Sequence, residues 1–210
     1  MKSAVALGCS HTAGTGLPNE HCYVSVLSQH YHMPIANLGV PGGNCHIVEK
    51  RLVEYLDNCV PDFVIAQWPN VFRMTVWNHG QATNETVSNG GALFRLTMKH
   101  GEENFYQPWI QTIITCNLLC KFAGVPVVNI MIEDVDQQYH TMLNQHGIVL
   151  HTDQKLPGLT WLMDHGALDK MHHSAYCHAQ WAERLIGLID ALDNANKKSK
   201  DTITQLQVLT

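Results

Sequence analysis

Residues 4–12 have the sequence AVALGCSHT, a short apolar run that stops at a glycine and is followed by polar side chains. Four consecutive apolar residues, Ala4–Leu7, are typical of a strand that is buried on both faces, as strands are inside a parallel sheet. The change to Gly8, Cys9 and Ser10 predicts that this strand ends in a tight turn that carries polar groups.

The rest of the chain repeats this alternation of short apolar runs with longer amphipathic ones. We expect further strands at 35–38, 63–68, 127–132 and, shorter, 159–163, and helices at 20–31, 44–58, 106–122, 135–145 and 174–192. Such alternation predicts a parallel sheet covered by helices on both faces, because the crossovers between parallel strands are right-handed. The predicted fold class is α/β, a three-layer α/β/α sandwich around a central parallel sheet of about five strands.

The composition is that of a folded globular protein, since 45% of the 210 residues are hydrophobic and 15% are charged. That balance excludes a disordered chain. With 13 basic and 18 acidic residues the net charge is −5, so the chain lacks the basic character of a nucleic-acid-binding protein. No apolar run approaches the roughly 20 residues that a membrane-spanning helix needs. We therefore expect neither nucleic acid nor a membrane as a partner.

The seven cysteines are scattered and contain no CxxC pair, which favours free thiols in a reducing compartment and hence a cytoplasmic protein. The first residues, MKSAVALGCSHT, are interpreted as the start of the buried strand rather than as a signal peptide. The 14 histidines form no HExxH motif. We expect neither a metal site nor a cofactor.

Two segments depart from the alternation. Residues 72–103 form a polar insertion after a strand end, which is either a lid or substrate loop or a surface excursion without a role. Residues 194–210 form a polar tail, interpreted as mobile or as a loosely docked strand. Residues 1–193, including the insertion, are expected to form a single domain whose oligomeric state the sequence leaves open.

Polar clusters follow the first three predicted strands, at 8–12, 37–44 and 67–70, and a fourth, at 169–178, surrounds the start of the last helix. The carboxyl ends of parallel strands meet at one edge of a sheet, which is where such folds bind their ligands. We therefore expect these four clusters to converge in space.

These clusters resemble the motifs of the SGNH, or GDSL, hydrolase family, named after a serine, a glycine, an asparagine and a histidine. The resemblance spans residues 4 to about 190. The nucleophile turn is matched by Gly8-Cys9-Ser10, the glycine motif by Asn37 and Gly42, and the asparagine motif by Asn70. The histidine motif is matched by Asp169 and His172, followed by Ser174 and His178. The resemblance implies a flavodoxin-like fold. It also implies a serine esterase acting on a small acyl ester, such as an acetyl group on a carbohydrate.

The resemblance assigns a role to each matched residue. Ser10 would be the nucleophile, His172 the base that takes its proton, and Asp169 the carboxylate that orients the imidazole. The backbone N–H groups of Ser10 and Gly42 and the side-chain amide of Asn70 would form the oxyanion hole. A glycine at position 42 would also let the backbone approach the substrate closely.

The chain departs from the family pattern in two places. Cys9 stands where the family usually has an aspartate, and Trp68-Pro69-Asn70-Val71 replaces the usual Gly-x-Asn-Asp. The departures keep alternatives open. One is a thiol-based reaction at Cys9, and another is a catalytically weak or inactive SGNH-fold protein that binds a carbohydrate or other ligand. A third is an assembly protein that works through its insertion or its tail.

Two further residues are candidate substrate contacts. His11 directly follows the serine, so it either lines the site or is a partly exposed loop histidine. Arg73 could bind an anionic group of the substrate, although a surface ion pair is the commoner role of an arginine.

Overall fold

The computed structural model describes residues 3–78, 81–86, 101, 103–131, 135–152 and 172–208. Its centre is a five-stranded parallel sheet with the order β2-β1-β3-β6-β7. The strands are β1 (Ala4–Gly8), β2 (Ile35–Gly39), β3 (Phe63–Trp68), β6 (Val127–Met131) and β7 (Leu150–Thr152). The predicted parallel sheet and its place in an α/β sandwich are confirmed.

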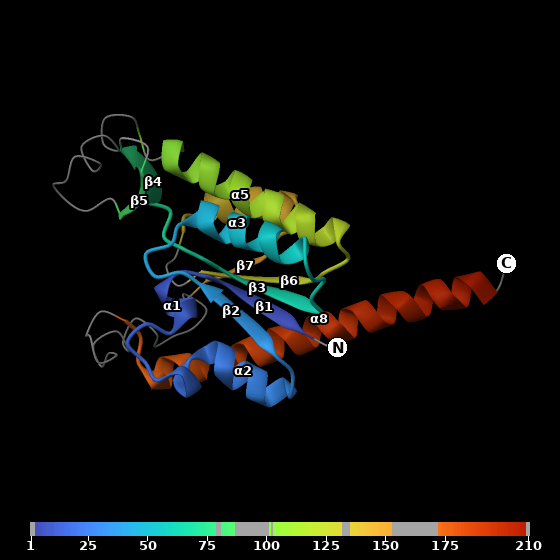
Figure 1. Cartoon of the computed structure of the whole chain (residues 1–210). Helices are drawn as coiled ribbons and strands as arrows, with labels where there is room; N and C mark the ends of the chain where they lie inside the picture. Colours follow the sequence, from blue (N-terminus) through green and yellow to red (C-terminus); the bar gives the residue numbers. More distant parts are fainter. Residues whose placement is uncertain are drawn as a thin grey trace.

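Helices cover both faces of this sheet (Figure 1). α2 (Tyr23–Tyr31) and α8 (Ala175–Val208) lie on one face, and α3 (Cys45–Leu56), α5 (Glu103–Phe122) and α6 (Gln137–Gln145) lie on the other. The core is correspondingly split into two apolar clusters. Val5 and Leu7 pack with the α3, α5 and α6 side, whereas Ala4 and Ala6 pack with the α2 and α8 side. This explains why β1 is apolar at successive positions, since alternate side chains point to opposite faces.

Two predicted elements differ from the structure or lie outside the described residues: the short fifth strand and the end of the last helix. The short strand predicted at 159–163 falls outside the described residues, and the fifth strand of the sheet is β7, paired with β6. The last helix, predicted to end at residue 192, continues to Val208, so residues 194–208 are helical and not a loosely docked strand. Figure 1 shows this part of α8 projecting beyond the body of the protein.

The carboxyl edge of the sheet gathers the elements that carry the polar clusters (Figure 1). They include α1 (Ser10–Ala13) and η1 (Asn19–His21), which follow β1, and the start of α8. The antiparallel hairpin of β4 (Arg73–Asn78) and β5 (Gln81–Thr86), part of the predicted insertion, follows β3 at the same edge. None of the helices in the described ranges is both long and apolar enough to cross a membrane.

Candidate active site

Ser10 is the first residue of α1, in the tight turn that follows β1, and it is 4% exposed. The turn requires glycine at position 8. A Cβ atom there would lie 2.2 Å from Thr12 Oγ1 and 2.6 Å from Gln67 Oε1. Close packing of the turn against β3 therefore accounts for the first residue of the Gly8-Cys9-Ser10 motif.

A single amide oxygen holds this turn in place. Gln67 Oε1 accepts hydrogen bonds from the Cys9 backbone N–H at 3.1 Å, from Cys9 Sγ at 3.2 Å and from Thr12 Oγ1 at 3.1 Å. Thr12 Oγ1 also lies 3.0 Å from the hydroxyl of Tyr23. Cys9 thus occupies the place of the family's aspartate with its buried thiol directed at Gln67. The sequence analysis includes Gln67 in the polar cluster 67–70 but assigns it no role, although a lone amide within the apolar strand Phe63–Trp68 was a signal.

The loop after β2 brings Gly42 towards the serine turn. The Val40 N–H donates to the Gly8 carbonyl at 2.9 Å, and the Gly43 N–H donates to the Val40 carbonyl at 2.8 Å. Gly42 has a φ of +71°, and no atom lies within 4 Å of the position that its Cβ would take. In the described protein, the backbone conformation and not crowding is what favours glycine here.

Asn37 and Asn44 hold the two ends of this loop. Asn37 Nδ2 donates to the Thr12 carbonyl at 2.7 Å, and its Oδ1 accepts from the Gly39 N–H at 3.0 Å. Asn44 begins α3 as its N-cap, with the Ile47 N–H donating to its side chain at 3.2 Å. These bonds fix the position of the 40–43 segment relative to α1.

Asn70 lies in the turn between β3 and β4. Its Oδ1 accepts from the Phe72 N–H at 2.8 Å, and its carbonyl accepts from the Arg73 N–H at 3.0 Å. The first bond fixes the orientation of the side-chain amide. The role of its NH₂ group as a donor in an oxyanion hole stays a prediction. The unusual Trp68-Pro69 pair is anchored, because Trp68 Nε1 donates to Asn129 Oδ1 at 3.0 Å and the Pro69 carbonyl accepts from Trp109 at 3.2 Å.

His172 reaches the serine turn from the far end of the sequence. Its ring centroid lies 5.5 Å from that of His11, the residue after Ser10, in an edge-on arrangement. The structure therefore brings together the first and last clusters of the chain. Asp169 lies outside the described residues, so its part in a catalytic triad stays a prediction.

No family model and no curated protein sequence matches this chain. Solved structures do match. Esterase EstA from Pseudoalteromonas sp. has a TM-score of 0.60 at 14% identity, covering 92% of this chain and 100% of that one. A GDSL-like lipase from Bacteroides thetaiotaomicron has a TM-score of 0.56 at 13% identity, and the match covers 91% of this chain and 89% of the lipase. Acetyl xylan esterase AlAXEase has a TM-score of 0.56 at 12% identity, and the match covers 89% of this chain and 99% of that esterase.

The chain has the SGNH hydrolase fold. The match extends over nearly the whole chain, as the motif resemblance implied, and the sheet order β2-β1-β3-β6-β7 confirms the flavodoxin-like fold that the resemblance implied. At these identities the likeness concerns the fold. The activity of this chain has to be argued from its own residues.

In this SGNH fold, histidines from the residues just before α8 lie against His11 of the serine turn. The His11 ring lies 4.5 Å from His173, and His173 lies 5.2 Å from Trp181. His178 Nδ1 accepts from the Tyr23 N–H at 3.1 Å, so this imidazole is neutral and carries its proton on Nε2. The sequence singled out His178 only as a family match, and His173 only as the neighbour of His172 in an adjacent pair whose side chains should diverge.

Burial is the largest cause of the pKa shifts in this cluster. It lowers the pKa of His11 from 6.5 to about 2, with further lowering by His173, His172 and Arg73. It likewise lowers the pKa of His173 and of His178 to about 4, with the other histidines adding to the effect. His11 is half-buried and its ring lies against His172, and its part in binding the substrate stays a prediction.

Some buried polar atoms of the site lack partners within the described part of the chain. These atoms are His11 Nδ1, both ring nitrogens of His173, and Nε and Nη1 of Arg73. No three or more His, Cys, Asp or Glu side chains in the described ranges are placed to hold a metal ion.

Proposed function

We propose that this protein is a serine esterase that hydrolyses a small acyl ester, such as an acetyl ester of a carbohydrate, through a Ser10 acyl-enzyme. The observation that carries the proposal is the convergence of three clusters at one edge of an SGNH fold. Ser10 begins α1, the Gly42 loop is bonded to Gly8, and His172 lies against His11.

The proposed reaction has two steps. His172 takes the proton of the Ser10 hydroxyl while Oγ attacks the ester carbonyl carbon. The negative charge that forms on the carbonyl oxygen is stabilised by the N–H groups of Ser10 and Gly42 and by the amide of Asn70. His172 then protonates the departing alcohol, and a water activated by the same imidazole attacks the acyl-enzyme to release the acid and restore Ser10. Asp169 would hold the imidazole in the required tautomer.

The structural neighbours support this chemistry. EstA was solved inhibited by monoethylphosphonate, and AlAXEase is described as an acetyl xylan esterase. We propose by analogy that Ser10 reacts with phosphonate reagents and that acetyl esters are the first substrates to test. We also propose a reducing, cytoplasmic location, since all seven cysteines are free thiols. The β4–β5 hairpin, at the same edge, is proposed as part of a substrate loop.

Intact mass after treatment with a fluorophosphonate probe tests the proposal. We expect one adduct on the wild-type protein and one on Cys9→Ala, but none on Ser10→Ala. The Cys9 variant is the matched control, because Cys9 is the adjacent buried nucleophile and its thiol is bonded to Gln67. An adduct that disappears with Cys9 and persists on Ser10→Ala would support the thiol-based alternative instead.

A second candidate function is a non-catalytic SGNH-fold protein that binds a carbohydrate or other ligand, or takes part in an assembly. It is favoured by the Gln67–Cys9 arrangement and by Trp68-Pro69 in the third cluster, where the chain departs from the family. Carbohydrate binding by a folded protein that forms no phosphonate adduct would favour this function over the esterase.

A further inference from the structure

Arg73 is the first residue of β4 and stands next to the candidate site. Its backbone N–H donates to the carbonyl of Asn70, the candidate oxyanion residue, at 3.0 Å. Its Nε and Nη1 atoms are buried without a hydrogen-bond partner anywhere in the described ranges. A buried guanidinium normally has its N–H groups bonded to a carboxylate, because leaving a buried charge unpaired is costly.

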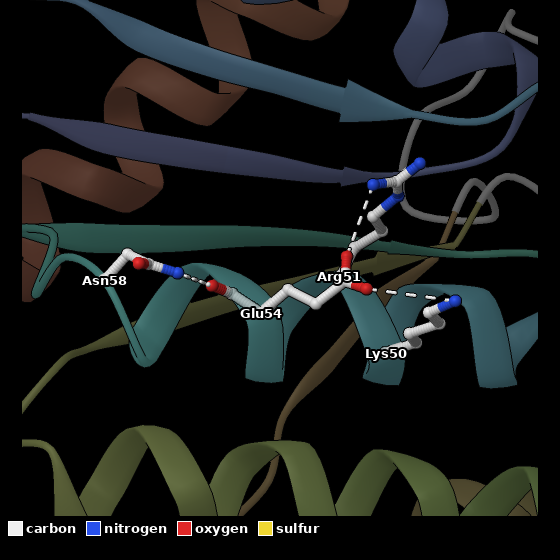
Figure 2. Close-up of polar contacts among 4 residues, drawn as sticks. All are labelled: Lys50, Arg51, Glu54 and Asn58. Atoms are coloured by element: carbon white, nitrogen blue, oxygen red, sulfur yellow. Dashed lines mark hydrogen bonds and ion pairs between the residues drawn. The ribbon is translucent and has the colours of Figure 1, made fainter.

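The arginine on α3 provides the contrast. Figure 2 shows Arg51 and Lys50 both directed at the carboxylate of Glu54, at 3.3 and 3.8 Å. Arg51 therefore forms a surface ion pair, which is the common role that the sequence analysis also considered for Arg73. Arg73 differs, since no salt bridge to it is found among the described residues and two of its nitrogen atoms, Nε and Nη1, are buried although the residue as a whole is half-buried.

The unpartnered atoms of the histidine cluster belong to the same neighbourhood. The charge of Arg73 acts on His11, whose ring lies 4.5 Å from His173. His173 is only 2% exposed, yet neither of its ring nitrogens has a partner within the described part of the chain. One cation and two imidazoles, each with an unused N–H or lone pair, thus lie in the neighbourhood of His11, the residue that follows the proposed nucleophile.

We propose that Arg73, together with His11 and His173, binds a carboxylate group of the substrate, so that the ester hydrolysed at Ser10 is an acidic one. This inference rests on the proposed function and names its substrate class. A carboxylate accepts two N–H groups from one guanidinium, which matches the planar arrangement of the arginine donors.

Charge balance favours a carboxylate over a phosphate. His11 and His173 are neutral at pH 7, because burial lowers their pKa values to about 2 and about 4. Arg73 therefore contributes a single positive charge, which one carboxylate neutralises. A phosphate monoester carries about −1.5 to −2 at this pH and would leave buried negative charge uncompensated.

Matched ester pairs test the inference. In the first pair, 4-acetoxybenzoate and its methyl ester, the carboxylate lies on the alcohol side of the hydrolysed ester. In the second pair, mono(4-nitrophenyl) glutarate and 4-nitrophenyl pentanoate, the carboxylate lies on the acyl side. We expect the kcat/KM ratio of anionic to neutral ester to be about 10 to 100 for one pair, as charge-assisted hydrogen bonds give. The ratio should fall to near 1 in Arg73→Gln and be intermediate in Arg73→Lys.

The control variant is Arg51→Gln, which removes the same charge from a surface ion pair and should keep the wild-type ratio. A wild-type ratio near 1 for both pairs would overturn the inference. An elevated wild-type ratio that Arg73→Gln leaves unchanged would also overturn it, since the preference would then come from other residues.

A binding measurement separates this inference from the proposed hydrolysis. Calorimetry on Ser10→Ala measures the binding of 4-hydroxybenzoate, glutarate and inorganic phosphate without any turnover. We expect one of the two carboxylates to bind at least 10-fold more weakly after Arg73→Gln is added. Such a loss in a protein that hydrolyses no ester would uphold the carboxylate site while refuting the esterase. Equal affinities in both variants, or tighter binding of phosphate than of either carboxylate, would overturn the carboxylate site.

Discussion

Acid should destabilise this protein through three buried histidines before its carboxylates titrate. Burial lowers the pKa of His11 from 6.5 to about 2, and it lowers the pKa values of His173 and His178 to about 4. The groups that face them come from several elements and include Arg73 on β4 and His172 before α8. The geometry of His178 agrees with a neutral ring, because its Nδ1 accepts the Tyr23 N–H and would lose that bond on protonation.

The sign follows from the direction of the shifts. In the unfolded chain these histidines take up protons as the pH falls through about 6.5, whereas in the folded protein they stay neutral until well below that. The free energy of unfolding therefore has its full value above pH 6.5 and falls as the pH decreases towards 4. Each histidine contributes about 1.4 kcal/mol per pH unit over this range, so at pH 5 each has cost about 2 kcal/mol.

The three histidines together should remove about 6 kcal/mol between pH 7.5 and 5.0, which is comparable to the 5–15 kcal/mol stability of a typical domain. Urea unfolding at a series of pH values measures this loss. In His173→Phe the loss should shrink to about 4 kcal/mol, because one titrating group is gone. His21→Gln, at an exposed position of η1, should behave as the wild type. The reasoning fails if the wild type loses less than about 2 kcal/mol, or if His173→Phe loses as much as the wild type.

The remaining predictions concern the turns around Ser10. Gly42→Ala and Gly124→Ala both place alanine at a φ of +71° in open space, so each should lower the free energy of unfolding by roughly 1–2 kcal/mol. Only Gly42→Ala should also reduce ester turnover, by about 100-fold, since displacement of a catalytic group by 1 Å has such an effect; equal turnover in the two variants would contradict its proposed role. Gln67→Leu leaves the buried Cys9 N–H and the Thr12 hydroxyl without their shared acceptor, which should cost about 2–4 kcal/mol in urea unfolding. Gln107→Leu, at an exposed position of α5, should change stability by less than about 0.5 kcal/mol, and similar values for the two leucine variants would refute the bonding role of Gln67.

The edge at which Ser10, Gly42 and Asn70 gather could be predicted from sequence because each follows a short, largely apolar strand of the central sheet. The three strands are neighbours in the sheet, and their register pairs Gly8 with Gly39 and Leu7 with Ala66. Parallel strands in such a register end at nearly the same level. A local pattern, apolar residues followed by small and polar ones, was therefore enough to locate these three residues at one edge.

Other features depend on contacts between distant segments and left little local signal. β7 has only three residues, too few for a periodic pattern, and its pairing with β6 is what makes it a strand. The end of α8 is polar and rich in lysine, so it has no apolar stripe that would predict a helix. Gln67 matters because Cys9 and Thr12 both reach its oxygen from another strand end.

Arg73 and His173 illustrate a further limit, since polar residue types suggest exposure and both have buried polar atoms. Such atoms lower stability when they lack partners, and proteins tolerate this mainly at functional sites. The groups that make the fold sensitive to acid are thus partly those proposed to bind the substrate. A carboxylate bound at Arg73 would accept the unused N–H groups, and its negative charge would favour protonation of His11 and His173. By linkage, the bound state should then tolerate acid better than the free protein. The acid sensitivity of the free protein and the proposed selectivity for an acidic ester would have the same physical origin.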